Sequence, residues 1–201
     1  QGIDLKLNAN GPDIATVTDF FDLPSLGSGP FVLNGSAGST PRGVELSLLA
    51  DLVELQIDAR GRVDSLTDPR DLELEWKVAE VGNSGIFYLA TTGHDAIYMG
   101  APEMQVLDDA RHREGGDPLT SAGAAYGLYP APRGVVNPAG EWNHVRIRVL
   151  GNDVEHWLNG VKIVDYELWT DEWKAMVAAT KFSEWPDYGL NKTGHIVLQD
   201  H

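Results

Sequence analysis

The chain has 201 residues, a length at which one domain with a two-sheet core is expected. Its formal net charge of −15 disfavours nucleic acid as a partner, because the phosphate backbone requires a basic surface, and it disfavours anionic membrane surfaces too. Cysteine is absent from the sequence, which excludes thiol catalysis, disulfides and zinc sites built from cysteine.

No apolar run approaches the length of a membrane-spanning helix, so we expect no membrane span. The chain opens with Gln-Gly and shows no signal peptide. We expect a secreted or periplasmic protein of the bacterial envelope whose leader has been removed, although the acidic, cysteine-free composition suits cytosolic proteins as well.

The first 64 residues differ in texture from the rest of the chain. Residues 24–43 are rich in Gly, Ser and Pro, which predicts loops around a short strand at residues 31–33. Residues 44–57 fit neither the helical nor the strand period cleanly, so they form either a pair of strands or a short helix.

From residue 71 the strand signals are stronger. Residues 71–78 alternate strictly, with Leu72, Leu74, Trp76 and Val78 on one face and charged side chains on the other. A Gly-Asn-Ser-Gly turn at residues 82–85 leads into an apolar strand at 86–89. A further strand at residues 103–108 carries Glu103 and Gln105 on the same face.

Beyond this strand, a charged loop is predicted at residues 109–120 and a short strand near 124–128. Residues 142–150 alternate again, and residues 195–201 form the last strand. Residues 169–179 are the best helix candidate; the alternative is that three Trp residues at 169–185 cover a sheet edge.

Many short strands without β-α-β spacing predict an all-β fold: a sandwich of two antiparallel sheets, with at most one or two short helices. We expect residues 1–201 to form one such domain, with 1–64 as its divergent part.

A β-hairpin is predicted around Asn159-Gly160, since type I′ turns require φ > 0 at both central residues. Its arms should pair Leu158 with Val161, Trp157 with Lys162, His156 with Ile163 and Glu155 with Val164. The apolar face contains Val154, His156, Leu158, Val161 and Ile163, and the other face carries Glu155, Trp157 and Lys162. That second face suits a sugar ring, which would stack on the indole, or is simply the solvated side of an amphipathic hairpin.

Five separated motifs resemble the 3-keto-disaccharide hydrolase family in sequence and order. They are Gly82-Asn-Ser-Gly-Ile-Phe, Pro102-Glu-Met-Gln-Val-Leu-Asp, Gly140-Glu-Trp-Asn, His156-Trp-Leu-Asn-Gly-Val-Lys and Leu198-Gln-Asp-His. The resemblance covers residues 65–201 and implies a concanavalin A-like jelly roll in a secreted or periplasmic protein. The opening segment of the family has no match in residues 1–64, and the strand that follows the Gln-Asp-His motif in the family is absent from this sequence.

The resemblance implies cleavage of glycosides whose C3 hydroxyl has been oxidised to a ketone. The ketone acidifies the C2 proton, a base removes that proton, the enolate expels the C1 leaving group, and water adds to the enone. Such a reaction needs a base, a donor at the C3 oxygen and an acid for the leaving group. It does not need the paired carboxylates of an ordinary glycosidase.

Glu103 is the candidate base, because a carboxylate on a sheet face beside apolar residues should have a raised pKa. A salt-bridged Glu at the rim is the alternative. Lys162 is the candidate cation for the ketone, and His201 is a candidate acid or base. The candidate substrate-binding residues are Gln105, Gln199, Trp157, Glu155 and Asn83.

Asp108, Asp109 and His112 could bind a divalent cation that polarises the ketone, and no other cofactor is expected. The alternative for this cluster is a solvated loop. His156 lies on an apolar face, where a hydrogen-bonded core residue is the commoner role and direct catalysis the rarer one.

Two other functions compete with this prediction. Asp71, Glu73 and Glu75 occupy alternate positions, as the catalytic acids of laminarinase-type jelly-roll endoglucanases do, but the Glu-x-Asp-x-x-Glu tract is absent, so a solvated outer face is favoured. A carbohydrate-binding module without catalytic activity is the second alternative. The enzyme is favoured because Glu103 and Gln105 align with a histidine-bearing strand end. In either case we expect a small-molecule carbohydrate as the partner.

Overall fold

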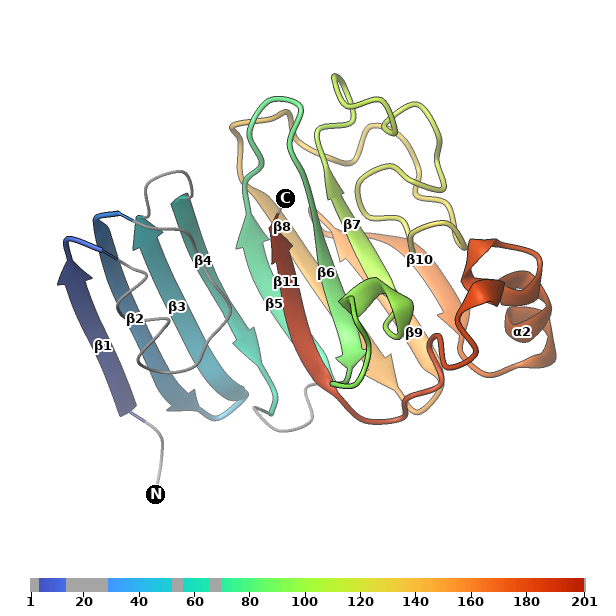
Figure 1. Ribbon diagram of the computed structural model, residues 1–201, viewed down its shortest axis with the longest axis horizontal. Helices are drawn as coiled ribbons and strands as arrows, with labels where there is room; N and C mark the ends of the chain where they lie inside the picture. Colours follow the sequence, from blue (N-terminus) through green and yellow to red (C-terminus); the bar gives the residue numbers. More distant parts are fainter. Residues whose placement is uncertain (1–3, 14–28, 52–55, 66–69, 201) are drawn as a thin grey trace. The chain divides into compact units, whose positions relative to one another are not determined.

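The computed structural model describes residues 4–13, 29–51, 56–65 and 70–200 (Figure 1). The chain divides into two compact units, Gln1–Val63 and Asp64–His201. This division coincides with the change in sequence texture near residue 64.

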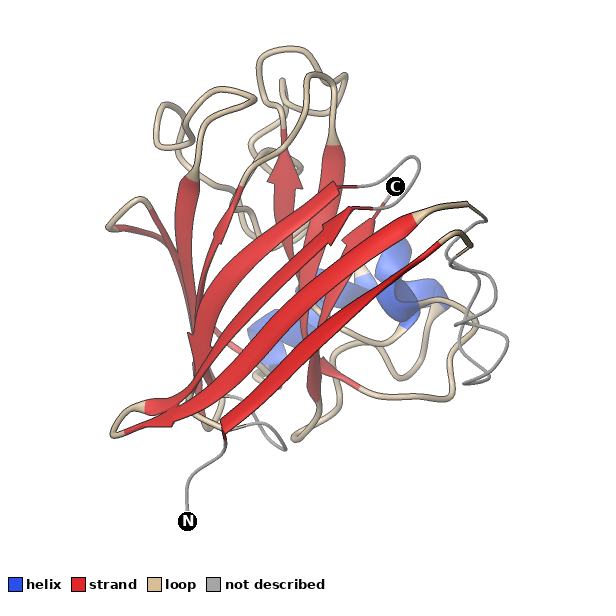
Figure 2. Cartoon of the chain, turned by 90° about the vertical axis from the view of Figure 1, so that its left-hand side faces the viewer, coloured by secondary structure: helices blue, strands red, loops and turns tan. Residues whose placement is uncertain are grey.

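The first unit is an antiparallel meander of four strands in the order β1-β2-β3-β4. The strands are β1 (Asp4–Gly11), β2 (Phe31–Thr40), β3 (Gly43–Asp51) and β4 (Gln56–Val63), and Figure 2 shows them side by side. The strand-pair alternative for residues 44–57 is therefore the correct one in its described part. The loop predicted after residue 33 is wrong, because β2 continues to Thr40. Its Gly and Ser residues form ladders with β1 and β3, and pairing on both sides outweighs their low strand propensity.

The second unit contains two antiparallel sheets. One has the order β5-β8-β9-β10 and the other the order β11-β6-β7. These strands are β5 (Asp71–Trp76), β6 (Asn83–Ala90), β7 (Glu103–Leu107), β8 (Asn143–Leu150), β9 (Asp153–Leu158), β10 (Val161–Glu167) and β11 (His195–Asp200). The prediction of an all-β fold with two antiparallel sheets is confirmed.

Alternating side chains place the core of this unit between its two sheets. Leu72, Leu74 and Trp76 of β5 are buried, and so are Val145, Ile147 and Val149 of β8, as their alternation predicts. From the other sheet Tyr88 of β6 reaches across the core, where its hydroxyl contacts His156 of β9 and Tyr166 of β10. Phe87, which precedes Tyr88 in β6, therefore lies on the opposite face of the sheet, where it packs with Ala90 and Ala101.

Helices are few and short in the described part of the chain. They are the 3₁₀ helices η1 (Ile97–Met99) and η2 (Lys181–Glu184) and the α-helix α2 (Asp171–Ala178), which confirms the helix predicted at 169–179. The Thr170 hydroxyl caps α2 by accepting a hydrogen bond from the Trp173 amide at 3.1 Å. With eight residues, α2 is far shorter than the roughly 20 residues that cross a bilayer.

Two local predictions differ from the structure in detail. The turn before β6 lies at Glu80 and Val81, so residues 83–85 already belong to the strand. At residues 124–128 the structure has isolated bridges of Ala125 to Met104 and to Tyr129 instead of a continuous strand.

The predicted hairpin forms, but its register shifts. Asn159 and Gly160 have φ values of 48° and 80°, as a type I′ turn requires, and Leu158 and Trp157 pair as predicted. Beyond Lys162 a β-bulge displaces the register, so His156 pairs with Val164 and not with Ile163. The bulge turns Val164 into the core in place of Ile163, which is half-buried, and strict alternation could not predict this. Val161, next to the turn and before the bulge, is 48% exposed although it pairs with the buried Leu158.

Candidate active site

The outer face of the β11-β6-β7 sheet carries a pocket of about 210 Å³. This volume lies below the roughly 300–1,000 Å³ of sites that enclose drug-sized ligands, so it suits one sugar ring better than a whole disaccharide. Its lining comes from the sheet, from η1 and η2, and from the loops around residues 114, 126 and 188: Asn83, Tyr98, Ala101, Glu103, Gln105, Glu114, Tyr126, Lys181, Phe182, Trp185, Tyr188 and Gln199.

The strand register builds the floor of this pocket. Gly85 of β6 pairs with Gln105 of β7 on one side and with Gln199 of β11 on the other, which sets the two amides in one row across the sheet. Glu103 lies two residues from Gln105 on the same face, and its side chain leans over Gly85. Any side chain at position 85 would occupy the place of the Glu103 carboxylate, so glycine at this position makes room for the acid.

Glu103 has the features of a catalytic base. Within the described part of the chain its carboxylate has neither a hydrogen-bond donor nor an ion-pair partner. Burial raises the pKa of Glu103 to about 7, an effect that Lys181 opposes and Glu114 reinforces. A carboxylate that is half ionised near neutrality and not used in structure is typical of functional sites.

Lys181 is the cation of the pocket, a role that the sequence patterns did not predict. Its ammonium lies 4.5 Å from the ring centre of Tyr126, and no carboxylate among the described residues forms an ion pair with it. The only sequence signal for Lys181 was the set of aromatic residues that follow it, Phe182, Trp185 and Tyr188. A charged residue in a solvated loop would not need such neighbours.

Stacked aromatic rings form one wall of the pocket. Tyr188 stacks on Phe182 with ring centres 4.1 Å apart, and Phe182 contacts Trp185 at 5.9 Å. Trp185 in turn contacts Tyr98, which is 41% exposed. Partly exposed aromatic rings offer an apolar surface on which the C–H face of a sugar can lie.

Several residues predicted for the site do meet in this pocket. Glu103, Gln105, Gln199 and Asn83 all line it. The Gln105 side chain is held in place because its Oε1 accepts a hydrogen bond from the Val106 amide at 3.0 Å. His201 lies outside the described residues.

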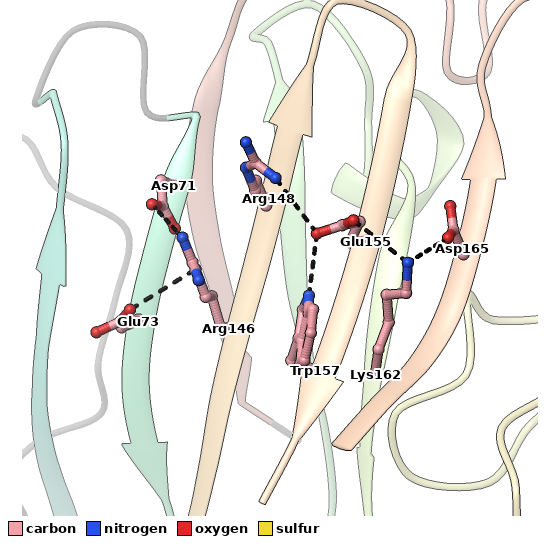
Figure 3. A network of polar contacts seen from close by, with 8 residues as sticks. All are labelled: Asp71, Glu73, Arg146, Arg148, Glu155, Trp157, Lys162 and Asp165. Atoms are coloured by element: carbon pink, nitrogen blue, oxygen red, sulfur yellow. Dashed lines mark hydrogen bonds and ion pairs between the residues drawn. The ribbon is translucent and has the colours of Figure 1, made fainter. Parts of the chain in front are cut away.

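Trp157, Glu155 and Lys162 are not part of this pocket (Figure 3). In β9, Glu155 and Trp157 alternate with His156 and Leu158, which point into the core. Glu155 and Trp157 therefore lie on the outer face of the β5-β8-β9-β10 sheet, and so does Lys162, which pairs with Trp157. There Glu155 accepts a hydrogen bond from Trp157 Nε1 at 3.1 Å, and Lys162 lies 2.5 Å from Asp165. The expectation that they share a site with Glu103 is therefore wrong.

The same outer face holds the acidic residues of β5. Arg146 donates two hydrogen bonds to Asp71, at 2.7 and 2.8 Å, and lies 3.6 Å from Glu73. Figure 3 shows Arg146 of β8 in contact with Asp71 and Glu73 of the neighbouring strand β5, the arrangement of a structural ion-pair network. The arrangement supports the interpretation that the acids of β5 are not catalytic.

The predicted metal cluster does not form. The side chains of Asp108, Asp109 and His112 bond separate backbone amides: Asp108 accepts from Val81 and Ala110, Asp109 from Ala122, and His112 Nδ1 from Glu114. No group of three His or acidic residues in the described part of the chain could hold a metal ion. These side chains fold the loop because turns expose amides that short polar side chains can satisfy.

His156 is a hydrogen-bonded core residue, which was the commoner role for its position. It is fully buried, and its Nδ1 lies 3.0 Å from the carbonyl oxygen of Gly123, which can only accept, so Nδ1 carries the proton. Its Nε2 therefore accepts the Tyr88 hydroxyl at 3.0 Å. Burial lowers the pKa of His156 to about 4, so the imidazole is neutral at physiological pH.

Comparison with known proteins gives three related findings. Residues 67–201 match the model of a protein family described as the 3-keto-alpha-glucoside-1,2-lyase-like domain. A Bacteroides thetaiotaomicron protein named 3-keto-disaccharide hydrolase is 39% identical over 154 residues, which cover 65% of this chain and 53% of that protein. This chain thus spans about half the length of that relative.

A solved structure agrees with the fold. It is a crystal structure described as a "putative glycosyl hydrolase" from Parabacteroides distasonis, with a TM-score of 0.62 and 25% sequence identity. The match covers 83% of this chain and 74% of that chain.

Proposed function

This chain belongs to the family of 3-keto-alpha-glucoside-1,2-lyase-like domains, and on that premise we propose that it is a glycosyl hydrolase or lyase that cleaves 3-keto-disaccharides. The observation that carries the proposal is the half-buried carboxylate of Glu103 on the floor of a sugar-sized pocket, where no described residue forms a hydrogen bond or ion pair with it. The name of the Bacteroides relative supports the same substrate class.

In the proposed reaction Glu103 removes the C2 proton. A C3 ketone makes that proton acidic, and a base with a pKa about 7 is matched to abstraction near neutral pH. Because the carboxylate has no partner in the described structure, no interaction must break before it takes the proton. The C1–O bond then breaks as the enolate collapses, and water adds to the enone that results.

Lys181 replaces Lys162 in this mechanism as the cation that stabilises the enolate. Its ammonium lines the same pocket as Glu103 and is close enough to lower the pKa of that acid. A fixed positive charge beside the C3 oxygen stabilises the enolate, in which this oxygen carries negative charge, more than it stabilises the neutral ketone. Only such a difference in stabilisation accelerates the reaction. Gln105, Gln199 and Asn83 are proposed to bind sugar hydroxyls, and Trp185 and Tyr98 to contact the ring face.

The test compares a 3-keto-disaccharide with its unoxidised parent and follows solvent deuterium at C2. We expect cleavage of the keto sugar alone, with deuterium incorporated at C2. The Glu103→Gln variant should lose about 10²–10⁴-fold in rate, as the removal of a general base does. Glu73→Gln, on the outer face of the other sheet, is the matched control and should remain within about two-fold of the native rate.

Equal turnover of both sugars would favour an ordinary glycosidase, for which Glu114 in the same pocket would supply the second carboxylate. Binding of either sugar without cleavage or exchange would favour a carbohydrate-binding module. A secreted or periplasmic location is part of the proposal and is tested by cell fractionation of the native host.

A further inference from the structure

Tyr126 lies directly beside the proposed base. Its backbone amide donates to the carbonyl of Glu103 at 3.0 Å, and the adjacent residue Ala125 bridges to Met104. The segment therefore runs antiparallel along the edge of β7 and places Tyr126 across from Glu103. Residues opposite each other in such a pair point to the same face, and both side chains line the pocket.

A carboxylate orients the Tyr126 hydroxyl. The hydroxyl donates to Glu114 Oε2 at 3.4 Å, a long hydrogen bond that leaves the group free to turn toward a ligand. Hydrogen bonds of catalytic groups are often long before substrate binds. Burial, followed by the charge of Glu114, raises the pKa of Tyr126, so the phenol keeps its proton at neutral pH.

Elimination requires a proton for the oxygen that leaves C1, and Glu103 cannot supply it while it takes the C2 proton. We propose that Tyr126 is the acid that protonates the leaving-group oxygen, with Glu114 as the residue that positions its hydroxyl. This inference rests on the proposed function and extends it.

The proposed step balances in atoms and electrons. Glu103 gains the C2 proton, the C2–H electron pair forms the C1–C2 double bond, and the C1–O pair departs on the leaving oxygen. The Tyr126 O–H proton moves to that oxygen, and the phenolate regains a proton from solvent or from Glu103. Lys181, whose ammonium lies over the Tyr126 ring, offsets the negative charge of the transient phenolate.

Other donors in the pocket fit this role less well. Tyr188 is buried within a stack between Phe182 and Trp173, which separates it from a departing sugar. Tyr98 faces solvent, and no carboxylate among the described residues orients its hydroxyl. Lys181 is assigned to the opposite task, because its charge serves the enolate only while it keeps all its protons.

The experiment varies the leaving group. Native protein, Tyr126→Phe, Glu114→Gln and the control Tyr129→Phe, a tyrosine outside the pocket lining, are assayed on the methyl and 4-nitrophenyl glycosides of the same 3-keto-glucose. Deuterium incorporation at C2 is followed in parallel. Nitrophenolate leaves without protonation, whereas methoxide needs an acid.

We expect Tyr126→Phe to lose about 10²-fold or more on the methyl glycoside and less than about three-fold on the nitrophenyl glycoside. Exchange at C2 should continue in this variant and exceed cleavage of the methyl glycoside. Glu114→Gln should show the same selectivity to a smaller degree, and Tyr129→Phe none.

Equal losses on both glycosides, or loss of C2 exchange in Tyr126→Phe, would overturn the assignment of Tyr126 and leave the proposed function intact. If the native protein neither exchanges C2 nor cleaves either keto glycoside, the proposed function falls and this inference falls with it.

Discussion

The Glu103 carboxylate lies over the backbone of Gly85, and a methyl group added at position 85 would be 2.9 Å from the Glu103 carboxyl carbon and closer still to Oε1. Such contacts are too short for the carboxylate to keep its place. The last glycine of the family motif Gly82-Asn-Ser-Gly therefore has a physical role, because it leaves space for the Glu103 carboxylate on the neighbouring strand.

Gly85→Ala should therefore displace Glu103 while the fold survives, because the flexible end of a side chain can move away. A shift of about 1 Å in a reacting group can cost about 10²-fold in rate. We expect a loss of that size on the 3-keto substrate with a nearly unchanged melting temperature. Gly116→Ala, where an added methyl group meets nothing within 4 Å, is the control and should be silent. Full activity in Gly85→Ala would argue that Glu103 is not the base.

The pH dependence of the rate should follow Glu103. Its pKa is about 7 and the base acts in its ionised form, so kcat/KM should rise with pH through about 7 and level off above about 8. A profile measured on the 3-keto-disaccharide over pH 5–9 checks this. A rate already constant from pH 5 upward would mean that the group that abstracts the proton has an ordinary carboxylate pKa.

The raised pKa of Glu103 also predicts that this residue lowers the free energy of unfolding at high pH. Its pKa is raised above the unfolded value of 4.5, so the folded protein binds the extra proton between pH 4.5 and about 7, and stability falls as pH rises through this window. Glu103→Gln should match the native free energy of unfolding near pH 4. Above pH 8 it should exceed the native value by at most about 3 kcal/mol. Urea unfolding at both pH values measures the difference, and equal stability at pH 8 would show that the ionised group is not penalised by burial.

The buried hydroxyl of Tyr88 should matter for stability and not for catalysis. Tyr88→Phe leaves His156 Nε2 without its donor and removes the acceptor of the Tyr166 hydroxyl. An unsatisfied buried polar group costs about 1–3 kcal/mol, so unfolding should require less denaturant by that amount. Activity per folded molecule, measured at low temperature, should stay native. A selective loss of activity would instead connect this core network to the pocket.

The sequence predicted the sandwich and the shared face of Glu103 and Gln105 for one physical reason. Alternation in β5, β8 and β9 reports which face is buried, and it placed His156 in the core. Alternation in β7 placed Glu103 and Gln105 on one face. Alternation cannot say which sheet a strand joins. For that reason the sequence pattern grouped the half-buried Trp157 and the exposed Lys162 with Glu103, although they lie on the outer face of the opposite sheet.

The other omissions have a similar origin. Loops and a single 3₁₀ turn contribute Lys181, Tyr126 and Glu114 to the pocket. Such segments have no hydrophobic periodicity in the sequence, and these residues reach the pocket only through tertiary packing. The acidic cluster at Asp108 looked like a metal site because sequence shows the carboxylates but not the backbone amides of Val81, Ala110 and Ala122 that they accept from.

The two candidate lysines provide a matched pair of variants. Lys181 lines the pocket and lowers the pKa of Glu103, whereas Lys162 lies in ion pairs with Asp165 and Glu155 on the other sheet. Lys181→Gln should reduce kcat by about 10²–10³-fold, the usual cost of losing a group that stabilises developing negative charge. It should also move the rise of the pH profile to higher pH, since the pKa of Glu103 then loses the cation that lowers it. Lys162→Gln should change neither quantity. If Lys162→Gln abolished turnover and Lys181→Gln did not, catalysis would belong to the outer face of the β5-β8-β9-β10 sheet, and the pocket over Gly85 would not be the active site.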